Sequence, residues 1–331
     1  MPEPERVTIR RIAGELNLSS STVSRALAGR PEISPETTRK VIETARRLGY
    51  RPPPEKRTVI LILPDTDTPL QSYSTGMLNA LRRECGIRHL QLEAVAADHL
   101  AMVDERTLCG AISFDFRNRL AFEWGRSHRL PLVCVNDMPH HLDGVYSVFT
   151  DEFQAMAEAV NHLAGFGHRR IGLLLTGAST HTSRNRRKGF EQVMRAHGFP
   201  LEGMIVDDAL FPPPPARVDG LGGMLRKLLD AEVSAMIVCG EGSAAEVYFT
   251  LRRFGFSLPE QLSLIVWEQP EFNRFAIPPL TSIAQDFNTL AKKAFDLLET
   301  VADGETPGED VPVPARLISR GSVFVPQKIM H

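Results

Sequence analysis

A segment near the start of the chain, LNLSSSTVSRALAG (residues 16–29), combines a run of hydroxyl side chains with one arginine. If a helix begins at Ser19, then Ser20, Ser21 and Arg25 lie along one side of it. The hydroxyls of Thr22 and Ser24, together with the free N–H groups at the helix start, can bind phosphate oxygens. An arginine can donate a pair of hydrogen bonds to guanine. This chemistry is that of a helix that reads duplex DNA; the alternative is a capped surface helix in a small bundle.

Three short helices within residues 1–50 are predicted to position this segment. Thr8 and Ser19 suit the N-caps of the first two helices, and Ser34 with a proline after it suits the third. Asn17 suits the turn between the first two helices because asparagine tolerates positive φ. The second helix ends at Gly29. Two helices joined by a tight turn form a helix-turn-helix, whose second helix lies in the major groove.

The charge of the chain is divided unevenly along the sequence. Residues 1–57 carry 12 Lys/Arg and 7 Asp/Glu, whereas the remainder carries 26 basic and 33 acidic residues. A basic segment on an acidic body indicates that the first segment binds a polyanion.

Residues 51–57 (RPPPEKR) are predicted to be a stiff, extended linker, because consecutive prolines exclude a helix.

Residues 58–331 alternate short apolar runs with amphipathic stretches. TVILILP (58–64), RRIGLLLTG (169–177) and VSAMIVCG (233–240) are typical of buried parallel strands, and stretches such as 153–167 are typical of helices. Such alternation predicts doubly wound α/β layers. About six strand signals over ~270 residues predict two of them, because a single domain seldom grows past ~250 residues.

Several classes of protein are not indicated by the sequence. The four cysteines are far apart and form no C-x-x-C, so we expect reduced thiols, no zinc site and no disulfides. We see no apolar run long enough for a membrane span and no signal peptide. No hydrolase, P-loop, dinucleotide-binding or zinc-protease motif is found, so we expect neither an enzyme nor a cofactor.

The N-terminal segment resembles the DNA-binding head of the LacI/GalR repressors. The resemblance is continuous over residues 7–52 and includes TVSR, the SPETTRKV start of the third helix, and the exit LGYRP. It implies base contacts from Ser20, Ser21 and Arg25. It implies phosphate contacts from a further set of residues: Thr8, Ser19, Thr22, Ser24, Thr37 and Tyr50. Ala28 replaces the asparagine usual in the family, so one polar contact is expected to be missing.

The body resembles the same family over most of residues 148–290, including RRKGF (186–190). The resemblance implies a periplasmic-binding-protein-like body, residues 58–331, made of two doubly wound parallel α/β lobes. We predict a first lobe of about 58–163 and 285–313 and a second of about 164–284 and 314–331, after the head (1–50) and the linker (51–57).

By position, the resemblance implies a set of effector-binding residues: Asp151, Arg186, Glu241, Glu268 and Gln285. Trp267 flanks this set and is a further candidate. Carboxylates accept hydrogen bonds from vicinal hydroxyls and an arginine donates them, so such a set can bind a polyol. Asp151 could instead be a plain helix cap, and Trp267 could stack on a sugar or pack in the core. Glu241 and Glu268 stand where the family has aspartates, which predicts a narrower cleft or a different ligand.

We therefore predict a cytoplasmic, homodimeric, sequence-specific transcriptional regulator, a repressor of the LacI family. Its partners would be a pseudo-palindromic operator and a small sugar-like effector bound between the lobes. The alternative is a sugar-binding sensor of the same body fold that does not regulate transcription. The linker lacks the family's hinge-helix pattern and is about ten residues short, so we expect weaker DNA bending.

Overall fold

The computed structural model describes residues 7–27, 29–30, 32–50, 58–67, 70, 72–103, 108–113, 119–128, 130–136, 145–176, 180–208, 216–240, 243–267, 270–302 and 311–326. The chain divides into two compact units, Met1–Arg57 and Thr58–His331. The predicted linker, 51–57, lies outside the described residues, as do Ala28, Glu241 and Glu268. Among the described helices, none has the length and apolar character needed to cross a bilayer.

The first unit contains three helices, α1 (Ile9–Leu16), α2 (Ser20–Leu27) and α3 (Pro35–Leu48). Their inward faces form one small core in which Ile12, Val23 and Val41 are fully buried. The predicted turn is confirmed, because Asn17 has φ 50° and ends α1 in the left-handed conformation. Gly49 ends α3 in the same way, with φ 72°.

The second unit contains two sheets, as predicted, each of six strands, which is twice the number of strands that the sequence indicated. The first has the order β11-β5-β4-β3-β1-β2 and is parallel throughout. Its strands are β1 (Thr58–Leu63), β2 (Gln91–Ala96), β3 (Leu108–Ser113), β4 (Leu132–Val135), β5 (Val145–Thr150) and β11 (Val311–Val313). The helices around it are α4 (Ser72–Ile87), the 3-10 helix η2 (Ala97–Met102), α5 (Arg119–His128) and α11 (Phe287–Ala302).

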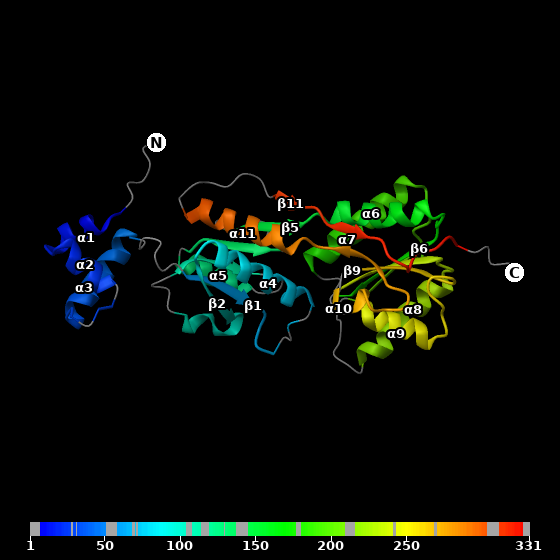
Figure 1. Cartoon of the computed structure of the whole chain (residues 1–331), viewed down its shortest axis with the longest axis horizontal. Helices are drawn as coiled ribbons and strands as arrows, with labels where there is room; N and C mark the ends of the chain where they lie inside the picture. Colours follow the sequence, from blue (N-terminus) through cyan, green and yellow to red (C-terminus); the bar gives the residue numbers. More distant parts are fainter. Residues whose placement is uncertain are drawn as a thin grey trace. The chain divides into compact units, whose positions relative to one another are not determined.

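Strand β1 shows why its sequence is a continuous apolar run. Val59 and Leu61 pack into the core that contains α4 and α11, whereas Ile60 and Ile62 pack into the opposite core, with η2 and α5. Both faces of the strand are therefore buried, as in other doubly wound parallel sheets. In Figure 1 the orange helix α11, late in the chain, lies beside the cyan helix α4, early in the chain.

The second sheet has the order β12-β10-β9-β8-β6-β7, and only β12 runs antiparallel to its neighbour. Its strands are β6 (Ile171–Thr176), β7 (Ile205–Asp208), β8 (Ala235–Cys239), β9 (Ser263–Trp267), β10 (Thr281–Ala284) and β12 (Arg316–Ile318). The helices of this lobe are α6 (Glu152–Gly165), α7 (His181–Ala196), α8 (Ala216–Asp230), α9 (Ser243–Arg253) and α10 (Pro270–Asn273).

The prediction that residues up to 163 belong to the first lobe is wrong for helix α6. Its apolar residues Ala155, Met156 and Val160 pack into the core of the second lobe, together with Phe190 of α7. Gly189 explains the close packing of the two helices, because a Cβ at this position would lie 3.1 Å from the Cα of Phe153. The chain therefore passes from the first lobe to the second directly after β5, at Asp151.

Candidate functional site

Helix α2 has one apolar face and one polar face. Val23 and Ala26 are buried in the core of the first unit. Ser20, Ser21, Ser24 and Arg25 are all exposed. The structure thus places on one open surface the three side chains that were predicted to touch bases, and Ser24 with them.

The starts of the three helices hold several of the predicted phosphate-binding residues. The Oγ1 of Thr8 accepts a hydrogen bond from the Arg11 N–H at 3.3 Å, and the Oγ of Ser19 accepts one from the Thr22 N–H at 3.0 Å. The Ser19 hydroxyl also lies 2.8 Å from the hydroxyls of both Ser21 and Thr22. The start of α2 is therefore a connected set of hydroxyls beside the first N–H groups of the helix, a favourable place for a phosphate oxygen.

Thr37 and Tyr50 are held by the third helix. The backbone N–H of Thr37 donates to Ser34 Oγ at 3.2 Å, and the Ser34 hydroxyl donates to Thr37 Oγ1 at 2.8 Å. Tyr50 is half-buried against the core of the unit, and this burial raises the pKa of its phenol. The phenol is therefore protonated at neutral pH and is available as a neutral donor.

Arg186 is the centre of a buried polar cluster in the second unit. It lies on α7, and its Nε and Nη2 donate to the two carboxylate oxygens of Glu152 at 2.7 and 3.0 Å. Its guanidinium carbon lies 3.7 Å from the ring centroid of Trp267, at the end of β9. Arg186 and Glu152 are only 7% and 3% exposed. One edge of the guanidinium is thus held by a carboxylate and one face by an indole.

The close approach of α6 and α7 at Gly189 positions this ion pair, because Arg186 lies one turn before Gly189 and Glu152 is the first residue of α6. Burial raises the pKa of Glu152, while the Arg186 guanidinium opposes that rise. The carboxylate in turn raises the pKa of Arg186, against the effect of burial. Cys239 lies in the same electrostatic environment, and burial raises the pKa of its thiol to about 12.

A second polar group surrounds Asn136, which follows β4 in the left-handed conformation with φ 58°. Its Nδ2 donates to the Tyr73 hydroxyl at 3.1 Å and to Gln285 Oε1 at 3.0 Å. Its Oδ1 accepts from the Thr150 N–H at 2.7 Å. Asn136 therefore fixes the orientation of the Gln285 amide, whose oxygen faces Asn136. Tyr73 is also near enough to Arg186 to contribute, after Glu152 and Cys239, to the raised pKa of the guanidinium, so the two polar groups adjoin.

Of the predicted effector residues, the structure brings Arg186 and Trp267 together and places Asp151 next to Glu152. Asp151 is half-buried and caps α6, with its Oδ1 accepting from the Gln154 N–H at 2.9 Å. Gln285 lies in the Asn136 group. The indole Nε1 of Trp267 is buried and has no hydrogen-bond partner among the described residues.

Three residues of the site, Glu152, Asn136 and Tyr73, were not predicted from the sequence. Glu152 follows the predicted site residue Asp151 and is an acid in the first turn of an amphipathic helix, which was the available signal. Asn136 follows a buried apolar strand, where polar residues of parallel sheets commonly face a ligand. Tyr73 carries no such local signal, because its role depends on a contact with a residue 63 positions away.

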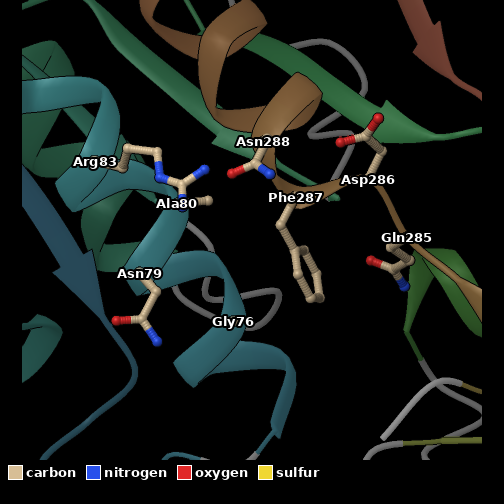
Figure 2. Close-up of a pocket in the computed structure, with 8 residues that line it drawn as sticks. All are labelled: Gly76, Asn79, Ala80, Arg83, Gln285, Asp286, Phe287 and Asn288. Atoms are coloured by element: carbon tan, nitrogen blue, oxygen red, sulfur yellow. The ribbon is translucent and has the colours of Figure 1, made fainter. Parts of the chain in front are cut away.

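A cavity of about 280 Å³ lies between α4 and the start of α11 (Figure 2). Its polar lining is Asn79, Arg83, Gln285, Asp286 and Asn288. Gln285 is the sole predicted effector residue in this lining. We therefore take the buried cluster around Arg186, with the Asn136 group, as the candidate effector site, and the cavity as a feature that adjoins it.

Gly76 and Phe287 support this side of the candidate site (Figure 2). A Cβ at Gly76 would lie 2.5 Å from Cε2 of Phe287, whose ring also packs edge-on against Tyr73 with centroids 5.7 Å apart. We expect Gly76→Ala to displace the Phe287 ring and destabilise the body by about 1–3 kcal/mol, measured by urea denaturation. Gly86→Ala is the control on the same helix, because a Cβ there has no neighbour within 4 Å; equal destabilisation by both changes would contradict the argument.

Comparison with known proteins identifies two matching family models. Residues 8–53 match the bacterial regulatory proteins of the lacI family, and residues 160–323 match a periplasmic binding protein-like domain. The chain is 26% identical to the transcriptional repressor CytR of Escherichia coli K12, over 95% of this chain and 96% of CytR. It is 24% identical to the repressor PurR of Mannheimia succiniciproducens, over 96% of this chain and 98% of PurR.

Solved structures with the same fold include DNA-bound and ligand-bound regulators. The structure of the transcriptional regulator CelR in complex with cellobiose has a TM-score of 0.70 and 21% identity, and covers 96% of this chain and 100% of CelR. The lac repressor dimer bound to operator and an anti-inducer has a TM-score of 0.68 and 17% identity, with 97% and 100% coverage. With both family models and relatives matched along nearly their full length, the chain belongs to the LacI family of bacterial regulatory proteins.

Proposed function

We propose that the protein is a transcriptional repressor that binds a pseudo-palindromic operator as a homodimer and whose operator affinity is set by a small polar, sugar-like metabolite. The observation that carries the proposal is the exposed face of α2, where Ser20, Ser21 and Arg25 stand clear of the core beside a capped helix start. In helix-turn-helix proteins this part of the second helix contacts base edges.

The DNA-binding roles follow from chemistry and position. Ser20, Ser21 and Arg25 would contact bases. The phosphate-binding set would be Thr8, Ser19, Thr22, Ser24, Thr37 and Tyr50. The basic charge of residues 1–57 supports this assignment, because phosphate neutralisation supplies much of the affinity for duplex DNA. Operator binding also requires that the protein act where DNA is, so we place it in the cytoplasm.

The effector would bind at the Arg186 cluster and the Asn136 group. Asp151, Arg186, Trp267 and Gln285 are the described members of the predicted set, and Glu241 and Glu268 remain predictions. A relative of the same fold has been solved with cellobiose, which supports a sugar-like ligand. The relatives that match along nearly their full length are named as transcriptional regulators, and we propose a binding role and no catalysis for this chain.

Selection from random duplexes with the full-length protein tests the DNA-binding role. We expect enrichment of a two-fold symmetric sequence whose half-sites are about one helical turn apart, or a multiple of it. Binding to the selected duplex should weaken steeply with added salt, because several phosphates are neutralised. Equal affinity for all duplexes would contradict the proposal. Sugar binding without any duplex preference would instead indicate a sensor that does not regulate transcription.

A further inference from the structure

We infer that Glu152 determines the charge of the effector: it neutralises Arg186 from within the protein, so that the site takes an uncharged ligand and rejects anionic ones. This inference rests on the proposed function only in taking the Arg186 cluster as the effector site. It adds a specificity-determining residue, Glu152, that is not among the predicted effector residues.

The ion pair between Arg186 and Glu152 has a two-point geometry. Both carboxylate oxygens of Glu152 are engaged by Arg186, through Nε and Nη2. An arginine that binds a ligand carboxylate or phosphate does so through such a two-point contact. Here that contact is already made inside the protein, between two residues that are 7% and 3% exposed.

The remaining capacity of Arg186 is that of a hydrogen-bond donor. Its Nη1 makes no hydrogen bond within the described part of the chain, and one face of the guanidinium lies against Trp267. Gln285 is held by its oxygen, so its amide nitrogen is turned away from Asn136. Donors of this kind suit hydroxyl and ring oxygens of an uncharged polyol, which accept hydrogen bonds without bringing a charge.

The net charge around Arg186 also disfavours an anionic ligand. Arg186 and Glu152 cancel, and the carboxylate of Asp151 is close enough to raise the pKa of Glu152. The charged side chains Asp151, Glu152 and Arg186 together therefore carry a net negative charge. A phosphate or carboxylate that approached Arg186 would meet the buried carboxylate of Glu152 beside it, and a like charge in a poorly hydrated site is strongly unfavourable.

Inorganic phosphate is a probe that requires no knowledge of the effector. The melting temperature of the full-length protein is measured in phosphate and in sodium chloride of equal ionic strength, for the wild type, Glu152→Gln and the double variant Glu152→Gln/Arg186→Gln. We expect no phosphate-specific stabilisation of the wild type. Glu152→Gln should bind phosphate on the order of tenfold more tightly or better, because one opposing charge is gone.

The double variant is the matched control. It keeps every predicted DNA-binding residue, so it reports any phosphate bound elsewhere, and it should lose the phosphate response that Glu152→Gln gains. If Glu152→Gln does not fold alone, Glu152→Ala replaces it, and phosphate-dependent recovery of the folded protein is then the expected result. The inference is overturned by phosphate-specific stabilisation of the wild type that the double variant lacks. The inference is also overturned if neither Glu152→Gln nor Glu152→Ala responds to phosphate.

The phosphate experiment tests the role of Glu152, and the duplex selection tests the proposed function. Either one can fail without the other. A wild type that selects an operator and also binds phosphate through Arg186 refutes the inference and leaves the proposed function standing. A wild type that rejects phosphate but shows no duplex preference refutes the proposed function alone.

Discussion

Replacing Arg186 with leucine is expected to lower the free energy of unfolding of the body by about 3–5 kcal/mol, because the change leaves the Glu152 carboxylate buried without its counter-charge. The expectation follows from the burial of both partners and from the two hydrogen bonds between them. Urea denaturation followed by tryptophan fluorescence measures it, since Trp267 lies against the Arg186 guanidinium and reports on this part of the body.

The double variant Arg186→Leu/Glu152→Leu separates the loss of a contact from the burial of an unpaired charge. Apolar replacement of a whole buried ion pair is often neutral or stabilising, so we expect the double variant to recover most of the stability lost by the single one. It should still lose the response to effector while operator binding persists, because the predicted DNA-binding residues are untouched.

Arg187→Leu is the control on the next residue of the same helix. Arg187 is 46% exposed and pairs with Glu191 and Asp207, and surface pairs of this kind contribute about 0–1 kcal/mol. The explanation would be wrong if the Arg187 and Arg186 variants were equally destabilised, or if the double variant were as unstable as Arg186→Leu.

The helices of the first unit could be predicted in detail because their signals are local. Thr8, Ser19 and Ser34 each cap a helix with a hydrogen bond to a residue three positions later. Asn17 and Gly49 end helices in a left-handed conformation that few other residues adopt easily. Each of these features depends on a stretch of a few residues, so the sequence contains all of the information that they require.

The two sheets could be predicted for a similar reason, but the division between the lobes could not. A strand buried on both faces is apolar along its whole length, as β1 is, and this pattern is visible in the sequence. The sequence of helix α6 shows an apolar face but does not show which lobe that face packs against. What assigns it to the second lobe is Gly189, 37 residues after Glu152, where the absence of a side chain lets α7 approach.

The candidate effector site was predicted only in part, because its geometry depends on distant pairs. Family position indicated Arg186, but its partner Glu152 lies 34 positions away and could have been a solvated acid. The role of Gln285 likewise depends on Asn136, 149 positions earlier in the chain. Contacts between residues so far apart in the chain are set by tertiary packing, and residue types along the sequence do not predict them.

Replacing Arg25 with alanine is expected to relax base preference at one position of each operator half-site. A two-point contact between arginine and guanine is worth about 1–3 kcal/mol of discrimination, so selectivity at that position should fall roughly 5- to 150-fold. Arg25 is exposed on α2, away from the buried residues Val23 and Ala26, so the change should leave the fold of the first unit intact. Competition binding with operator duplexes mutated one base pair at a time measures the effect.

Two further variants on α2 distinguish a base contact from a phosphate contact. Ser24→Ala removes an exposed hydroxyl that is predicted to bind phosphate, and it should weaken binding to all duplexes by a similar factor. Arg25→Lys keeps the positive charge but loses the planar two-point donor, so binding to random DNA should persist while base preference falls. If Arg25→Ala instead weakened every duplex equally, Arg25 would be a phosphate contact. Base preference would then have to come from Ser20, Ser21 and the shape of the DNA, which predicts a far less selective operator.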